Sequence, residues 1–357
     1  MSQPVSTVHG PLWISRQDNQ GSAATSGWKK FHRVSGKVSI GKEAGKADWL
    51  DGSRYADSYD YISSIQVTGQ FTVHGSADAI GSLAAWALGD DAITGSGPYA
   101  HEITSASTIP YLTIITALGE DPVNQIHEHY DCQITSLVIE GSADADVLTA
   151  QVEVVGIHPG KVRATEPTAA SESEEPLLHY NAEDTFTLAG LNGGDEVKTV
   201  NQARLTVSNG ITAYYGDSVR PVALVPGRGE ITVDFTVLAD EDSLELLNNY
   251  YYGTPAPANG DEPTASVFKE GFSVNYSRGA GADARGVQID IPELVYSIEE
   301  YPEADAGGDP IEIACTGAAR VPEGGDVADI ITITATTTDD ESYTDGSSPP
   351  SPPGPSE

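Results

Sequence analysis

The stretch that decides the fold is Ser64–Asp91, SIQVTGQFTVHGSADAIGSLAAWALGDD. Its first part alternates apolar and polar side chains, which predicts a strand with one buried face. Its second part changes to the helical period, with apolar residues on one face at Ile80, Leu83, Ala84 and Ala87. Ser76 is suited to cap the helix N-terminus and Gly89 to end the helix. The stretch therefore predicts a strand that runs into an amphipathic helix.

A second stretch repeats this pattern. Residues 229–253, GEITVDFTVLADEDSLELLNNYYYG, also begin with an alternating strand, continue through Ala-Asp into a helix and end at a glycine. The pairing predicts a mainly β protein with two tandem β-barrel or β-sandwich domains, each with one flanking helix.

Composition divides the chain into five parts. Residues 1–60 are polar and glycine-rich and are predicted to form an extended N-terminal arm, and residues 61–163 a first compact domain. Residues 164–182 are rich in Pro, Ala, Ser and Glu and predict a linker. Residues 183–337 contain further strand patterns and a helix at 240–251, and are predicted to form a second domain. Residues 338–357 are acidic and then Pro/Ser-rich, which predicts a disordered tail.

The charge of the chain limits its partners. It has 357 residues, with 53 Asp and Glu against 18 Lys and Arg, a formal net charge of −35. Few cations are left to neutralise phosphates or anionic lipids, which excludes a conventional nucleic-acid or membrane-surface binder. The acid-rich, Lys-poor composition fits a protein from a high-salt organism, and an ordinary acidic protein fits equally. With no signal-peptide pattern and no apolar run of about 20 residues, we expect synthesis in a host cytoplasm and no membrane span.

The predicted arm combines tryptophans with clustered cations. Six of the 18 cations lie between Lys29 and Lys46. In so acidic a protein, their natural partner is the acidic surface of the same chain or of a neighbouring copy. We therefore predict arm contacts between subunits at Trp13, Trp28, Lys29, Lys30, Arg33 and Trp49.

The order of several short motifs resembles one known family. The first half carries GSADAIGSLAAWALG, YAHEIT, STIPYLTIIT, DCQITSLVIEG and VLTAQVEVVG between Gly75 and Gly156. The second half carries RGEITVD, GVQIDIP and IACTGAA between Arg228 and Ala319. Together they resemble the tail tube (major tail) proteins of long non-contractile tailed viruses, the siphovirus type. Each motif alone is generic β-sequence, and the resemblance rests on their order across residues 48–320.

The resemblance implies a structural virion protein without enzymatic activity or cofactor. Copies would form rings that stack into a tube through which viral DNA passes during ejection. Tail terminator, tape measure and distal tail proteins would be its other partners. Rings in this family generally have six-fold barrel symmetry with one domain per subunit, so two domains per chain predict a trimeric, pseudo-six-fold ring in preference to a hexamer. The polar strand faces are predicted to line the lumen, at Gln66, Thr68, Gln70, Thr72, Thr232, Asp234 and Thr236. The alternative is that these residues face outer solvent or pack under a helix.

Other functions have weaker signals. A carbohydrate- or cell-surface-binding β-sandwich, such as a tail-tip module, is the main alternative, and an all-β glycan hydrolase is the third. His127 and His129 would share one strand face, but spacing supplies no third metal ligand. The sequence lacks a nucleophile elbow, a phosphate loop and a dinucleotide fingerprint. We therefore predict no metal, cofactor or catalytic site.

Overall fold

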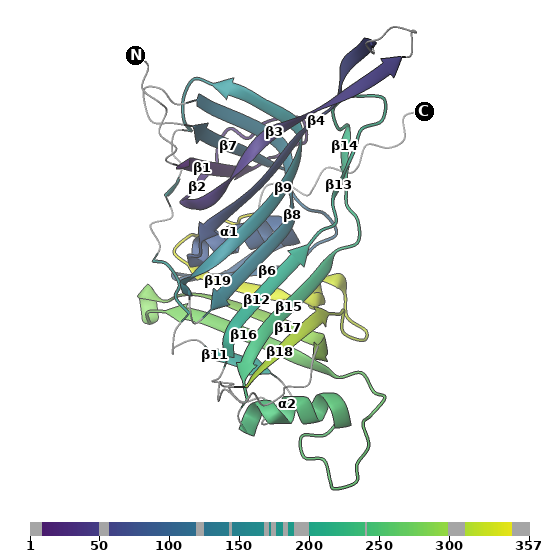
Figure 1. Cartoon of the computed structure of the whole chain (residues 1–357). Helices are drawn as coiled ribbons and strands as arrows, with labels where there is room; N and C mark the ends of the chain where they lie inside the picture. The colour runs from purple at the N-terminus through teal and green to yellow at the C-terminus, as the bar shows by residue number, and fades with distance from the viewer. Residues whose placement is uncertain are drawn as a thin grey trace.

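The computed structural model describes residues 9–49, 57–118, 125–142, 145–167, 171–172, 176–180, 185–188, 200–239, 241–298 and 311–344 (Figure 1). The fold is mainly β, as predicted. The helices are α1 Ala77–Leu88 and α2 Glu241–Tyr252, with short 3-10 turns at Gly281–Asp283 and Val327–Ile330. The strands are β1 His9–Arg16, β2 Lys29–Phe31, β3 Arg33–Trp49, β4 Asp57–His74, β5 Gly89–Gly95, β6 Tyr99–Ser105, β7 Leu112–Leu118, β8 Gln125–Ser142, β9 Ala145–Arg163, β10 Ser171–Glu172, β11 Thr185–Leu188, β12 Val200–Ser208, β13 Thr212–Tyr214, β14 Ala223–Val225, β15 Glu230–Leu238, β16 Lys269–Arg278, β17 Arg285–Ile298, β18 Glu312–Ala319 and β19 Thr332–Thr337.

One antiparallel ladder crosses the whole molecule. Strands β3, β4, β9 and β8 pair in that order in the first half, and β12, β15, β18 and β17 pair in that order in the second. The pairing of β8 with β12 joins the two halves into one continuous sheet. Figure 1 shows this ladder running diagonally from the long β3–β4 hairpin to β18.

The two halves share one chain order within this ladder. In each half, the strand that comes first in the chain pairs with the second, and the second leads into a 12-residue helix. The third and fourth strands then complete the ladder, in which the spatial order is first, second, fourth, third. Both helices are followed by a glycine with positive φ, Gly89 at 108° and Gly253 at 70°. Alignment of the helices matches buried Phe71 with Phe235 and Val73 with Val237. Because the halves share one sheet, the division into two tandem domains stays a prediction.

The ladder packs its apolar face against a second layer. The N-terminal part of β17 pairs with β16 and β19, β19 pairs with β6, and β6 pairs with β5. Helix α1 lies behind the ladder in Figure 1 and is buried along its entire length. Its Ser76 cap accepts a hydrogen bond from the Ala79 amide at 3.1 Å, as the sequence predicts. Helix α1 therefore packs against both layers and holds the first half of the ladder in place.

The end of the described chain also belongs to this core. Tyr343 is buried; its ring stacks on His101 at 4.2 Å between centroids, and its hydroxyl bonds Asp78 at 2.9 Å. The indole nitrogen of Trp86 donates to the Tyr343 carbonyl at 3.0 Å. The sequence predicts a disordered tail from residue 338 onward, whereas in the structure Tyr343 is packed into the core. One aromatic ring supplies enough apolar area to hold this segment in place. Residues 345–357 lie outside the described residues.

His101 is a buried titratable side chain with two hydrogen-bond partners. Its Nδ1 lies 3.2 Å from both Asp91 oxygens and its Nε2 lies 3.0 Å from the Asp339 carbonyl oxygen. Burial opposes the charged ring, but the bonds to Asp91 and Asp339 outweigh it and raise the pKa of His101. A raised folded-state pKa gives stability that is fully present below the unfolded value of about 6.5 and is lost as pH rises through the folded value.

We therefore expect the free energy of unfolding to decline as the pH is raised from 6 to 9. Urea titrations at several pH values measure it. The glutamine in His101→Gln cannot be protonated as the imidazole ring can. The free energy of unfolding of this variant should therefore decline less over the same pH range. Equal declines in the two proteins would contradict this assignment.

Candidate functional site: the polar face of the ladder

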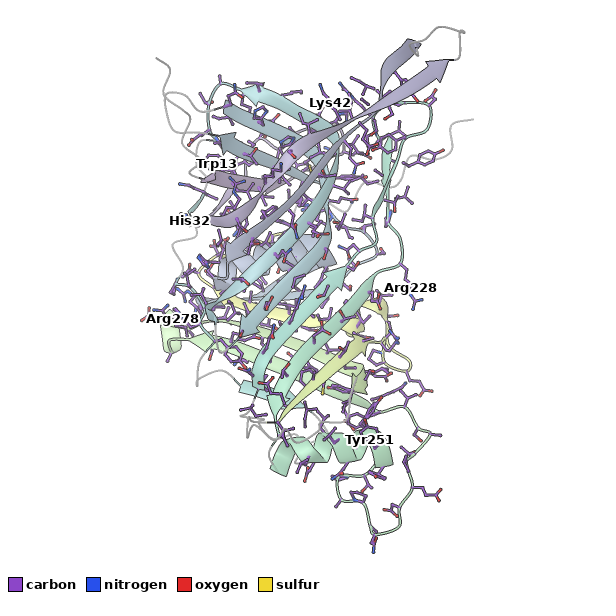
Figure 2. All side chains as sticks on the ribbon, in the orientation of Figure 1. Trp13, His32, Lys42, Arg228, Tyr251 and Arg278 are labelled. Atoms are coloured by element: carbon purple, nitrogen blue, oxygen red, sulfur yellow. The ribbon has the colours of Figure 1, made fainter. Side chains whose placement is uncertain are left out.

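The ladder has one apolar and one polar face. Successive side chains of a strand point to opposite faces, so residues opposite one another in the register share a face. One row places Phe71, Val152 and Leu137 on the core side, all fully buried. The rows between such core rows carry polar side chains on the other side, as Figure 2 shows along the front of the sheet.

All seven residues predicted to line a lumen share this polar face. One row runs without a break from Ser35 through Thr72, Gln151, Val138, Thr206, Thr232 and Ala318 to Val295. Thr72 of the first half and Thr232 of the second therefore lie in one cross-strand line. The other five lie an even number of positions from Thr72 or Thr232 along the same strands and so share their face: Gln66, Thr68, Gln70, Asp234 and Thr236. Their orientation toward a lumen stays a prediction.

Carboxylates predominate along these rows. Arg204 lies between Glu140 and Asp234 in the register, and Lys37 lies opposite Gln70. The carboxylates are partly held by polar neighbours, since Gln70 donates to Glu153 at 3.3 Å and Thr316 donates to Asp234 at 2.9 Å. These rows thus contain two cations, Lys37 and Arg204, and five carboxylates, Glu140, Glu153, Glu230, Asp234 and Glu312. The face is a polar surface of negative sign.

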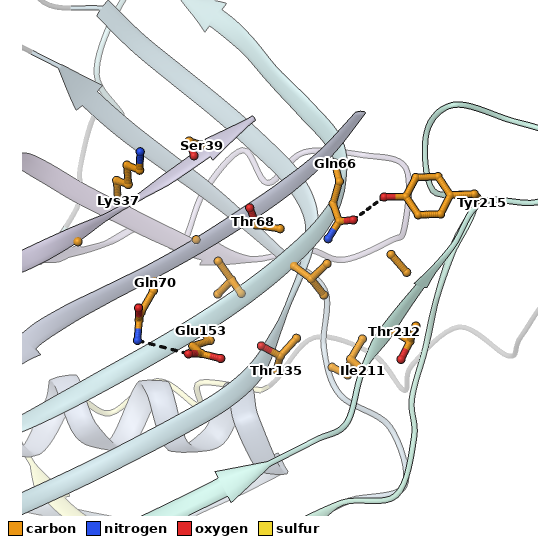
Figure 3. Close-up of a pocket in the computed structure, with 15 residues that line it drawn as sticks. Lys37, Ser39, Gln66, Thr68, Gln70, Thr135, Glu153, Ile211, Thr212 and Tyr215 are labelled. Carbon is orange, nitrogen blue, oxygen red and sulfur yellow. Dashed lines mark hydrogen bonds between the residues drawn. The ribbon is translucent and has the colours of Figure 1, made fainter. Parts of the chain in front are cut away.

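The β13–β14 hairpin covers one end of this face. A groove of about 860 Å³ lies between the hairpin and strands β3, β4 and β9 (Figure 3). The Tyr215 hydroxyl donates to the Gln66 side chain, and the Ile65 amide donates to the Val219 carbonyl at 2.7 Å. Val155 of β9 and Leu224 of the hairpin bury a small apolar cluster. Thr68 and Gln70 line this groove and are exposed.

The predicted arm residues lie mostly within strands. Trp13 and Trp28 are 2% and 4% exposed and form a cluster with Ile115 of the same chain. Lys29 bonds Asp78 and Asp339 of the same chain at 2.5 and 2.6 Å. Lys30 and Arg33 are partly buried, and the side chain of Trp49 lies outside the described residues. Trp13, Trp28 and Lys29 therefore have partners within the same chain. Contacts of this segment with another subunit stay a prediction.

The histidine pair singled out in the sequence lies at the other end of β8. The rings of His127 and His129 stack with centroids 6.4 Å apart. Burial, and then the neighbouring His127, lower the pKa of His129 to about 4. Within the described ranges no three side chains are grouped to hold a metal ion. Among the described helices, none combines the length and the apolar character that a membrane span needs.

Comparison with known families decides the class of protein. A family model described as phage tail tube protein matches residues 11–337, nearly the whole chain. The chain belongs to the phage tail tube protein family. It is a structural component of the virion tail and not an enzyme, and members of this family assemble with copies of themselves and with other tail proteins.

Other comparisons add little to the tail tube assignment. No curated protein matches the chain. A crystal structure of a Pseudomonas aeruginosa FadL homologue matches at 8% identity over 92% of this chain and 88% of that chain, with a TM-score of 0.10. A likeness this weak carries no argument.

Two parts of the tail tube protein's polar face were not predicted from sequence. The first is the β8–β12 junction, which makes the two predicted faces one surface. The second is the hairpin at 211–225, whose strands have three residues each and show no period. The apolar residues of this segment, among them Val219, Val222 and Val225, were the available signal for the hairpin.

Proposed function

We propose that this tail tube protein forms rings that stack into a hollow tube, with the polar face of the ladder lining the lumen through which viral DNA passes. The observation that carries the proposal is the continuity of this face: eight strands from both halves present one polar surface, with the core on its other side. The predicted lumen residues Gln66, Thr68, Gln70, Thr72, Thr232, Asp234 and Thr236 would then face the DNA.

The charge of the face suits passage without binding. Protein affinity for DNA depends mainly on cations that neutralise phosphates and release counterions. The rows described above offer Lys37 and Arg204 among several carboxylates, so phosphate would meet a surface of its own sign. Hydroxyl and amide side chains keep that surface hydrated. DNA would slide past it without being held.

The repeated strand order supports three subunits per ring. Each chain contributes two four-stranded parts of the ladder with the same strand order, so three chains supply six such parts. We favour this trimeric, pseudo-six-fold ring over a hexamer. The tail terminator, tape measure and distal tail proteins would meet the tube at its ends or inside it. The acidic composition would keep the tube soluble at high salt.

Image reconstruction of assembled tubes tests the proposal. We expect three-fold symmetry, two similar units per subunit, and the Thr72–Thr232 row facing the axis. Helix α1 or the core face at the axis would overturn the lumen assignment. A true six-fold ring of one unit per subunit would overturn the stoichiometry.

Added cations should make the lumen retain DNA. We expect tubes of a Thr68→Lys/Thr232→Lys variant to bind duplex DNA more tightly than wild-type tubes, with an affinity that falls steeply with salt. Retention of fluorescent DNA by sedimented tubes measures it. The control variant Leu244→Lys/Val267→Lys adds the same charge at exposed positions elsewhere, 48% and 63% exposed. Equal retention by the two variants would contradict the lumen assignment.

A further inference from the structure

A hairpin of the first half covers a strand edge in the second half of the same chain. Helix α1 leads into the β5–β6 hairpin, and β6 pairs antiparallel with β19, with Ile103 opposite Ile333. The other side of β19 is occupied by β17, so β6 closes its remaining edge. Both isoleucines are 0% exposed. The Ala106 amide then donates to the Leu88 carbonyl at 2.8 Å, which ties the end of the hairpin to the end of the helix.

The second half has a loop at the corresponding place. Helix α2 leads into the loop Gly253–Thr264, and the Thr264 amide donates to the Tyr251 carbonyl at 2.7 Å, in the same way as at the end of α1. Asp261 forms the turn of this loop, since its side chain accepts a hydrogen bond from the Ala258 amide at 2.6 Å. The loop contains no strand and its side chains are mostly exposed. Figure 1 shows it projecting from the end of the molecule below α2.

The first half has an open edge at the place that β19 has in the second. The outer part of β9, Ile157–Arg163, pairs with the N-terminal part of β8, as β19 pairs with the N-terminal part of β17. On its other side β9 pairs with β4 only as far as Gly156, and the described residues supply no strand beyond it. Val162 is 73% exposed, the highest value among the large apolar side chains that the structure describes, whereas Ile333 on the covered β19 is fully buried.

The loop and the open edge lie too far apart to meet within one chain. Figure 1 places α2, at the base of the loop, and β7 at opposite ends of the molecule. The outer part of β9 lies one strand away from β7, because both pair with the N-terminal part of β8. A partner for either must therefore come from another molecule. A second copy matches both, since its first half repeats the relation that the second half has to the first within one chain.

We propose that the loop Gly253–Thr264 of one copy packs against the outer part of β9 of the next copy, with Asp261 and Glu262 facing Lys161 and Arg163 and with Val162 beneath the loop. The contact rests on the self-assembly proposed above and adds a junction in the outer layer, apart from the ladder. Neighbouring copies would then be joined by an acidic loop at the place where the two halves of one chain are joined by a β-hairpin.

The charges of the two surfaces fit this occupant. The loop has two carboxylates, Asp261 and Glu262, and no cation, whereas the outer part of β9 has Lys161 and Arg163 and no carboxylate. Arg163 already bonds Glu128 of its own chain, while Lys161 is exposed and lies 5.1 Å from the centre of the Tyr130 ring. Two loops would repel each other, as would two β9 ends, so opposite charges favour the head-to-tail arrangement.

Prolines determine how the loop binds. Pro255, Pro257 and Pro263 have no amide hydrogen, so the loop cannot form with β9 the regular ladder that β6 forms with β19. Side-chain packing over Val162 and ion pairs with Lys161 are left to hold it. The ion pairs lie at the surface, so their contribution to assembly should fall as salt is added.

Reversed charges test the contact in assembling tubes at low ionic strength. Lys161→Glu and Glu262→Lys each bring like charges together, and we expect each to raise the protein concentration needed for half-assembly about threefold or more. Val162→Glu should raise it about tenfold, because a carboxylate would be buried beneath the loop. Sedimentation of tubes over a range of protein concentrations measures these values. Urea unfolding of the unassembled proteins should match wild type, since all three side chains are exposed.

The double variant Lys161→Glu/Glu262→Lys makes the test specific. Its two positions do not meet within one chain, so the reversed pair should restore assembly close to the wild-type value by meeting between copies. Lys161→Glu/Glu323→Lys is the matched control, because it has the same net charge but places the new lysine at an exposed position outside the loop. We expect it to stay as impaired as Lys161→Glu alone.

Two results would overturn the contact between the loop and β9 and leave the tube function standing. One is equal assembly by the double variant and its matched control. The other is assembly of all three single variants at the wild-type concentration. Failure of the wild-type protein to form tubes would count against the proposed function itself.

Discussion

Replacement of Lys29 by methionine is expected to lower the free energy of unfolding by about 3–5 kcal/mol, because it leaves two carboxylates in a poorly hydrated site without their cation. The Lys29 ammonium lies 2.5 Å from Asp78 and 2.6 Å from Asp339, and it also lies 4.3 Å from the centre of the Tyr343 ring. The lysine side chain is 13% exposed and that of Asp78 is 11% exposed, so solvent screens the pair weakly. Methionine keeps a stem of similar length and removes the ammonium group, with both its charge and its hydrogen bonds to Asp78 and Asp339.

The effect of Lys29→Met should depend on pH in a defined direction. Burial alone would raise the pKa of Asp339, but Lys29 outweighs burial and lowers it. A lowered folded-state pKa gives stability that is present above the unfolded value and is lost as pH falls through the folded value. The difference between wild type and Lys29→Met should therefore be full at neutral pH and shrink in acid, where protonated carboxyls no longer need a cation.

Urea titration of both proteins at neutral and acidic pH measures this difference. Lys269→Met is the matched control, because Lys269 also bonds a carboxylate, Glu293 at 2.8 Å, but is 52% exposed. An exposed pair of this kind is worth about 0–1 kcal/mol. If the two variants lose equal stability, the Lys29 site does not hold the strands and the C-terminal segment together.

Local structure could be predicted from the sequence because local periodicity determines it. The strand predicted at 229–238 is β15, Glu230–Leu238, and the one at 286–297 is β17, Arg285–Ile298. β15 has one fully apolar side, and the apolar residues of β17 alternate from Val287 to Ile291 and again, after a shift of one residue, from Leu294 to Ile298. A period of two was therefore visible in each strand. The helix caps Ser76 and Gly89 were predictable for a similar reason, since each satisfies backbone groups at a fixed position.

The pairing of strands far apart in the sequence, and the alignment of the two halves, could not be predicted with the same certainty. The similarity of GQFTV and GEITV suggests aligning Gly69 with Gly229, but the helices align Phe71 with Phe235 instead. The identity of each side chain on a half-buried strand is loosely constrained. Two short strand sequences can therefore be aligned with a shift of an even number of residues and still place apolar residues on the same face. The strand β3 was hidden in the predicted arm because its glycines and lysines blur the alternation. Its place was determined by pairing with β4, which local sequence does not encode.

The equivalent helices should differ greatly in their sensitivity to mutation. Helix α1 packs mainly against β5, β6, β8, β17 and β19, whereas the main strand contact of α2 is β17. Trp86 of α1 is 2% exposed and meets the Phe31 ring edge-on at 6.0 Å. Tyr250 occupies the same place in α2, but it is only partly buried and its ring contact is the adjacent Tyr251 at 5.0 Å.

We therefore expect Trp86→Ala to cost about 3–5 kcal/mol of unfolding free energy, through lost burial and a cavity that the two rigid layers cannot close. Tyr250→Ala should cost about 1 kcal/mol or less, because solvent can fill the space that this partly buried side chain leaves. Trp86→Phe separates the ring from its polar group: it keeps most of the packing but leaves the Tyr343 carbonyl without its indole donor, so its cost should fall between the two. Thermal and urea unfolding of the three variants measure this order. Equal losses in Trp86→Ala and Tyr250→Ala would mean that the repeated sequence pattern, and not the burial of α1 between two layers, sets the contribution of each helix.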